Sequence, residues 1–262
     1  MDQRTEGRIG QRPREVTAVR SAVCVAAHLG DEAFYAAGAI DELVQAGARV
    51  SVVVLAPRLA PLPVLGPLAL AGTDRSALAA RSAEVLGLSR VEVLDMSEPP
   101  LSVPERIALQ ARLCAILREE RPDLLLSHGP GLTTKAVDRR AAATLANAAI
   151  AAAAFGLAPP LPRNGHHWEL PERWFFAPAY LTLATPARLA HVFGEDSAWK
   201  LSWVVCDTRE LVARKWEALR AYIHHAAEAP PTAFRPYLEQ ERYIRATRRG
   251  SGLRTVASKA AG

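Results

Sequence analysis

The chain has 262 residues, of which 50% are hydrophobic and 23% are charged, and its formal net charge is +5 at pH 7. This composition excludes a wholly disordered chain and a collagen-like one, and the length suffices for one compact domain with a substantial core. Six basic residues and no acidic residue lie between residues 242 and 262, so the rest of the chain is close to neutral. We therefore expect no nucleic-acid partner.

No apolar run is long enough to cross a bilayer, and residues 1–19 lack the apolar stretch of a secretory signal. The three cysteines, Cys24, Cys114 and Cys206, lie far apart in apolar surroundings, which is typical of reduced core thiols. The excess of arginine over lysine and the abundant alanine suggest a GC-rich bacterial genome. We expect a cytoplasmic protein without a membrane span.

Short apolar runs alternate with stretches of helical period over the first 155 residues. The runs that we expect to be buried strands are residues 21–27, 50–55, 91–94 and 122–127, and the expected helices are residues 33–46, 74–86, 104–120 and 138–155. Asp74 and Gly87 are expected to begin and end the second helix, and Ile107 is expected on the inner face of the third. This alternation predicts an α/β fold with a Rossmann-like open, mostly parallel sheet and helices on both faces.

The pattern is less regular in the loops and in the last third of the chain. Residues 56–73 are expected to form a loop over the strand ends, and the proline-rich residues 158–171 to lead into another strand. Further expected elements are a strand at 203–207, a helix at 208–225 and a last short helix at 236–245. We expect a flexible arm at 1–19, a single domain at 20–246 and a basic flexible tail at 247–262.

Polar side chains follow two of the predicted strands. The first strand leads into His28, Asp31 and Glu32, and the fourth leads into His128, with Asp138 and Arg139 at the start of the next helix. Ligands of open parallel sheets bind outside the carboxyl ends of the strands. A histidine and an aspartate three residues apart on a tight turn can face one metal ion, although a catalytic zinc requires a third protein ligand.

Several short segments occur in a fixed order along the chain: Ala27-His-Leu-Gly-Asp-Glu32, Gly38, Gly47-Ala-Arg-Val50, Arg81-Ser-Ala-Glu84 with Leu86-Gly87, Arg121-Pro-Asp123, Lys215 and Glu241-Arg-Tyr243. On these segments the chain resembles, from about Ala22 to Arg245, the PIG-L, or LmbE-like, family of zinc-dependent N-deacetylases. The resemblance implies the LmbE-like fold, a zinc cofactor, and hydrolysis of the N-acetyl group of an N-acetylglucosaminyl or related metabolite.

The resemblance assigns zinc ligation to His28 and Asp31, but two further positions differ from the family pattern. The position of the general base is Gly30, which has no side chain to accept a proton. The position of the third ligand is Arg139, whose guanidinium stays protonated and does not coordinate zinc. Glu32 is the candidate for a substitute base, although the family uses it as a structural residue. We expect zinc to be absent or weakly bound.

Other histidines are candidates for the missing ligand. His128 is the best placed, although we expect it to be a strand-end histidine bonded to the backbone; His166 and His167 come next, on a predicted loop surface. His224 and His225 are expected at a solvated helix end. We hypothesise instead that Arg139 pairs with Asp31 and replaces the metal, because a buried carboxylate without a partner is costly.

Three functions remain open from the sequence. The favoured one is a metal-free, catalytically impaired or repurposed family member whose pocket, formed by His28, Asp31, Glu32, His128 and Arg139, binds a small molecule such as a sugar or an N-acyl metabolite. The first alternative is an active deacetylase with an unorthodox third zinc ligand, and the second is a scaffold subunit. The chain lacks the G-x-G-x-x-G and G-x-S-x-G motifs, which excludes a standard dinucleotide site and a nucleophile-elbow hydrolase.

Overall fold

The computed structural model describes residues 19–59, 61–65, 68–129, 136–155, 170–177 and 199–248. Its strands are β1 (Ser21–Leu29), β2 (Arg49–Leu59), β3 (Arg90–Val93), β4 (Leu124–His128), β5 (Glu172–Phe176), β6 (Trp199–Asp207) and β7 (Gln240–Arg248). Its helices are α1 (Asp31–Tyr35), α2 (Ala37–Gln45), α3 (Arg75–Leu86), α4 (Val103–Glu120), α5 (Val137–Phe155) and α7 (Val212–Arg220), with short 3-10 turns at Arg209–Leu211 and Arg235–Leu238.

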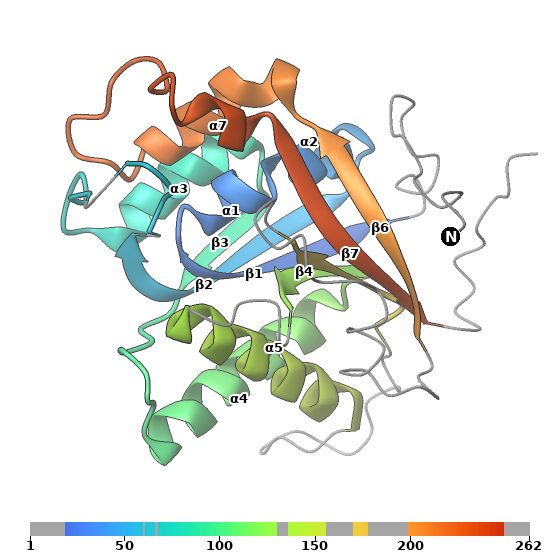
Figure 1. The fold of residues 1–262 in the computed structure, drawn as a ribbon. Helices are drawn as coiled ribbons and strands as arrows, with labels where there is room; N and C mark the ends of the chain where they lie inside the picture. Colours follow the sequence, from blue (N-terminus) through green and yellow to red (C-terminus); the bar gives the residue numbers. More distant parts are fainter. Residues whose placement is uncertain are drawn as a thin grey trace, which may run out of the picture.

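The strands form one sheet in the order β3-β2-β1-β4-β5-β7-β6. The neighbours from β3 to β5 are parallel, and β7 runs antiparallel to both β5 and β6. Helices α4 and α5 cover one face, while α1, α2, α3 and α7 cover the other (Figure 1). The predicted Rossmann-like, mostly parallel sheet with helices on both faces is therefore confirmed.

The central strand shows why continuous apolar runs form the middle of this sheet. All nine residues of β1 are buried, and successive side chains enter two separate cores. Cys24 lies opposite Val52 and Leu126 in the core beneath α1, α2 and α7, whereas Val23 and Val25 pack against α4 and α5. The other two cysteines are also buried and free, as expected.

The turn region after β1 differs in detail from the prediction. Strand β2 continues to Leu59, rather than ending at residue 55, because Leu29 pairs with Leu59 after a register shift beyond His28. The expected helix at 33–46 is divided at Ala36, where φ is −132°. Both differences affect the site, since the extended β2 carries Arg58 to it and α1 begins directly at Asp31.

Two of the predicted helix ends are confirmed. Asp74 precedes α3, and its Oδ1 accepts a hydrogen bond of 2.9 Å from the backbone N–H of Ala77. Gly87 ends the helix with φ of 73°, a left-handed conformation that favours glycine. The prediction for Ile107 was wrong: it is 60% exposed, because α4 buries Leu109, Leu113, Cys114, Ile116 and Leu117 instead.

The prediction of a helix over residues 236–245 was also wrong for most of that span, because a 3-10 turn ends at Leu238 and strand β7 begins at Gln240. Within β7, Glu241 and Tyr243 are buried while Gln240 and Arg242 are exposed, which is the two-residue period of a strand. The expected helix at 208–225 is shorter, since α7 spans only Val212–Arg220. Among the described residues, no helix has the length and apolar character needed to span a membrane.

A buried ion pair joins β7 to the helices behind the site. Glu241 Oε1 accepts hydrogen bonds from Lys215 Nζ at 2.7 Å and from the backbone N–H of Gly38 at 2.8 Å. Its Oε2 accepts from Ala39 N–H at 3.2 Å and from the hydroxyl of Tyr243. Three segments that carry the family resemblance therefore meet at one carboxylate, where they hold α2, α7 and β7 together.

Candidate functional site

The site lies where the sheet changes its direction of winding. The chain proceeds from β1 to β2 and β3 on one side and later returns to β4 and β5 on the other, so β1 and β4 are adjacent at a topological switch point. Ligands of open α/β sheets bind in the crevice at this point, outside the carboxyl ends of the strands. His28 is close to the end of β1 and His128 is the last residue of β4, so both lie at that edge.

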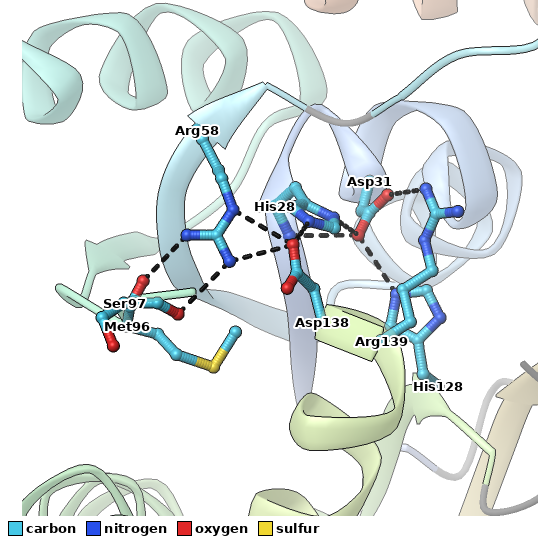
Figure 2. A network of polar contacts seen from close by, with 8 residues as sticks. All are labelled: His28, Asp31, Arg58, Met96, Ser97, His128, Asp138 and Arg139. Carbon is cyan, nitrogen blue, oxygen red and sulfur yellow. Dashed lines mark hydrogen bonds and ion pairs between the residues drawn. The ribbon is translucent and has the colours of Figure 1, made fainter. Parts of the chain in front are cut away.

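Asp31 is the centre of the polar network at this edge (Figure 2). Its carboxylate is fully buried, and its Oδ1 accepts a hydrogen bond of 3.0 Å from Nη2 of Arg139. Its Oδ2 accepts from the backbone N–H of His28 at 3.0 Å and lies 3.1 Å from Nε2 of His128. The guanidinium of Arg139 also lies over the ring of Tyr35, 5.2 Å from its centroid. The expected ion pair of Arg139 with Asp31 is present.

A second aspartate and a second arginine complete the network. Oδ2 of Asp138 lies 2.7 Å from Nε2 of His28 and accepts a hydrogen bond of 3.0 Å from Nε of Arg58. Arg58 also donates from Nη1 to the backbone oxygen of Met96 at 3.0 Å and from Nη2 to that of Ser97 at 3.3 Å. Figure 2 shows that His28 lies between the two aspartates, and its Nδ1 is 3.4 Å from Oδ2 of Asp31.

Neither Asp138 nor Arg58 has a role predicted from the sequence. For Asp138 the available signal was its position beside Arg139, at the start of the helix that follows β4. No signal in the sequence pointed to Arg58, because residues 56–73 were expected to form a loop.

The network shifts the pKa values of its members in different directions. Burial raises the pKa of Asp31, but the charge of Arg139 and the contacts with His128 and His28 outweigh it, so this pKa lies well below its usual value. Burial lowers the pKa of His28, but Asp31 and Asp138 reverse that effect and the net pKa is raised. For His128 burial prevails over the attraction of Asp31, so its pKa is lowered.

Glu32 lies beside this network and is held by other partners. Its Oε1 accepts hydrogen bonds of 2.8 Å from both the Ser82 and Tyr222 hydroxyls, and its Oε2 accepts from the backbone N–H of Gly30 at 3.1 Å. Burial raises the pKa of Glu32 in spite of these hydrogen bonds. Since both carboxylate oxygens are in use, the contacts of Glu32 fasten the turn to α3 and to the end of α7.

Gly30 is packed so closely that a side chain at this position would meet apolar atoms. Its φ is 89°, and a Cβ here would lie 3.2 Å from Cδ2 of Leu219, 3.7 Å from Cδ2 of Tyr222 and 3.9 Å from Cδ1 of Leu59. The position that the resemblance gives to the general base thus combines a left-handed backbone with an apolar surround. An aspartate here would need both the backbone and the neighbouring side chains to move.

The residues present do not fit a catalytic zinc. The cationic guanidinium of Arg139 lies against Asp31, where the resemblance requires a third ligand. Among the residues that the structure describes, no group of three His, Cys, Asp or Glu side chains is arranged to hold a metal ion. His128 contacts the carboxylate of Asp31 rather than a backbone group, which corrects the expectation for this residue.

The other histidine candidates lie elsewhere. His224 and His225 are exposed residues beyond α7, and their rings stack on each other with centroids 3.8 Å apart. His166 and His167 lie outside the described residues, as do residues 1–18 and 249–262 of the predicted arm and tail.

Comparisons with known proteins agree with this fold. The family model for GlcNAc-PI de-N-acetylase (PIG-L) matches residues 23–150, which run from β1 into α5 and include His28, Asp31 and Arg139. No curated protein sequence matches the chain.

Solved structures with this fold include enzymes of more than one kind. N,N′-diacetylchitobiose deacetylase from Pyrococcus horikoshii is 17% identical, with 90% of this chain and 87% of that one covered and a TM-score of 0.57. The 4-carboxy-2-hydroxymuconate hydratase GalB from Pseudomonas putida is 23% identical, with 84% and 82% covered and a TM-score of 0.56. The A40926 pseudoaglycone deacetylase Dbv21 is 16% identical, with 88% and 98% covered and a TM-score of 0.53. The family match over residues 23–150 and the LmbE-like fold together agree with the resemblance of this chain to the PIG-L family.

Proposed function

We propose that this chain is a metal-free member of the PIG-L family that binds a small sugar or N-acyl metabolite at the carboxyl edge of its sheet. In this proposal it does not carry out zinc-dependent de-N-acetylation. The deacetylases with a similar fold support a sugar-like ligand, since one acts on N,N′-diacetylchitobiose and another on a pseudoaglycone. The location at the topological switch point supports a ligand site at this edge.

The ion pair of Arg139 with Asp31 carries the proposal. It places a permanent cation 3.0 Å from the carboxylate that would have to ligate zinc, and that carboxylate is completely buried. A zinc ion next to the guanidinium would meet strong repulsion in surroundings of low dielectric constant. The guanidinium already supplies the positive charge that a buried carboxylate needs.

The packing around Gly30 gives independent support. A deacetylase of this family needs a base close to the metal-bound water, whereas Gly30 has no side chain and the space next to it is lined by Leu59, Leu219 and Tyr222. Glu32 is not a ready substitute, because Gly30, Ser82 and Tyr222 already donate hydrogen bonds to its two oxygens.

Metal content and acetate release test the proposal together. The full chain would be produced in medium supplied with zinc, and its zinc content would be measured by elemental analysis before incubation with N-acetylglucosaminyl compounds. We expect well below one zinc per chain and no acetate release above the level without protein. Stoichiometric zinc with turnover would refute the proposal and establish the alternative, an active deacetylase with an unorthodox third zinc ligand.

A gain-of-binding variant tests whether Arg139 is the cause. Arg139→His removes the cation and supplies an imidazole where the resemblance requires one, so we expect this variant to acquire zinc. The matched control is Arg140→His, which adds a histidine at the neighbouring exposed position and should remain metal-free. Equal zinc content in both variants would contradict the role given to Arg139.

A further inference from the structure

The members of the network differ in their access to solvent. The side chains of His28, Asp31, His128 and Arg139 are between 0% and 6% exposed. Those of Asp138 and Arg58 are 23% and 29% exposed. A molecule that approaches this network from solvent therefore meets Asp138 and Arg58 first, and the residues that the resemblance assigns to zinc lie behind them.

The two oxygens of Asp138 are used unequally. Oδ2 lies 2.7 Å from Nε2 of His28, 3.0 Å from Nε of Arg58 and 2.9 Å from Nη2 of Arg58. Within the described part of the chain, Oδ1 receives no hydrogen bond. Figure 2 shows this second oxygen on the side of the carboxylate that faces away from His28. Asp138, whose side chain is partly exposed, thus keeps one carboxylate oxygen available as an acceptor at this edge of the sheet.

Arg58 fixes the direction of this acceptor. Its guanidinium is held from behind by the backbone oxygens of Met96 and Ser97, and it contacts only Oδ2 of Asp138. The aspartate is therefore kept in one orientation, with Oδ1 left open. Arg58 is a positioning residue in this arrangement, because it acts through Asp138.

The charges of the network limit the kind of ligand that fits. Arg58 is paired with Asp138 and Arg139 with Asp31, so these four charges cancel, and His28 is shared between the two carboxylates. No unpaired cation of the network faces solvent to attract a phosphate or a carboxylate, while a carboxylate oxygen is exposed. Phosphate recognition normally depends on cationic side chains or free backbone N–H groups.

We propose that Oδ1 of Asp138 is the atom of this site that contacts the ligand, and that it accepts a hydrogen bond from a hydroxyl or amino group of an uncharged or cationic ligand. The proposal rests on the proposed function, since it assumes a small ligand at this edge. It makes Asp138 the residue that distinguishes sugars and amino sugars from their phosphorylated or acidic counterparts.

Three matched probes test this selectivity on the full chain after treatment with EDTA. D-glucosamine and D-glucose 6-phosphate each differ from D-glucose in a single substituent, and the affinities of all three would be measured by titration calorimetry and ligand-observed NMR. We expect D-glucosamine and D-glucose to bind, and D-glucose 6-phosphate to bind about tenfold more weakly or not at all. Tighter or equal binding of the phosphate, or no binding of any probe, would overturn the proposal.

Substitution of Asp138 tests whether this residue is responsible for the selectivity among the three sugars. Asp138→Asn keeps the shape and removes the charge, so it should weaken D-glucosamine about tenfold and D-glucose less. The ratio of the D-glucosamine affinity to the D-glucose affinity is measured within one variant, so partial unfolding would not change it. The matched control, Asp95→Asn, makes the same change at a nearby exposed residue and should leave all affinities unchanged. An unchanged ratio in Asp138→Asn would overturn the proposal.

Arg58→Met tests the positioning residue. Without Arg58 the carboxylate of Asp138 is free to turn, so Arg58→Met should weaken D-glucosamine binding in the native chain but add little further loss in Asp138→Asn, whereas simple loss of structure would weaken binding in both backgrounds. Equal losses in the two backgrounds, or no loss in the native chain, would remove Arg58 from the proposal. The zinc and acetate measurements are independent of these ratios, so a failure of the metal-free function and a failure of this inference are distinguishable.

Discussion

Replacement of Arg139 by methionine would test how far the fold depends on the ion pair. Methionine keeps most of the apolar stem but removes the guanidinium, which leaves His28 and His128 as the polar neighbours, among the described residues, of the fully buried Asp31 carboxylate. Breaking a buried ion pair from one side typically costs about 3–5 kcal/mol. Since both histidines still contact Oδ2, we expect Arg139→Met to lower the free energy of unfolding by about 3 kcal/mol, the lower end of that range.

Urea unfolding at pH 7 would measure this loss, with Arg140→Met as the control for an exposed arginine on the same helix. The control should change stability by less than about 0.5 kcal/mol. Adding Asp31→Asn to the Arg139 variant should recover part of the loss, because it removes the uncompensated charge. A loss below about 1 kcal/mol, or one equal to that of the control, would refute the view that Arg139 neutralises Asp31.

The same pair implies a direction for the pH dependence. The pKa of Asp31 is lowered in the folded protein, so its contribution to stability is present above the unfolded value of 3.8 and is lost as the pH falls through the folded pKa. The deficit of Arg139→Met should therefore be largest near neutral pH and should shrink in acid. A deficit that grows on acidification would contradict this assignment.

Three other predictions concern packing, a helix cap and the two histidines. Gly38→Ala would place a Cβ 2.4 Å from Cγ2 of Thr208 and 2.9 Å from Oε2 of Glu241, so we expect a loss of about 1–3 kcal/mol in urea unfolding, while Gly72→Ala, with nothing within 4 Å, should be nearly neutral. Asp74→Ala removes the N-cap of α3 and should cost about 1 kcal/mol by the same assay, and a neutral result would contradict the cap. In NMR titrations of the metal-free protein, His28 should titrate above 6.5 and His128 below it, and the reverse order would contradict the network.

Much of the fold was predictable because its signals are local. The apolar runs of β1 and β2 and the helical period of α3 and α5 reflect burial on one or two faces, and this periodicity is present in the sequence itself. The caps at Asp74 and Gly87 were predictable for the same reason, since a cap depends on neighbouring residues. The strand β7 was missed because it lacks such a signal: it carries Glu241 at a buried position and several arginines, so its apolar pattern is interrupted.

The sequence by itself determined the fold class and the edge of the sheet where the polar residues gather, because periodicity and parallel topology need no coordinates. Through the family resemblance it also predicted an arginine, Arg139, at the position of the third zinc ligand. Only the tertiary structure decided the partners: it brought Asp138 and Arg58 to His28, turned His128 toward Asp31, and closed the space beside Gly30 with Leu219 and Tyr222. Such contacts join residues up to about two hundred positions apart, and they depend on side-chain directions that only the packed sheet and helices fix.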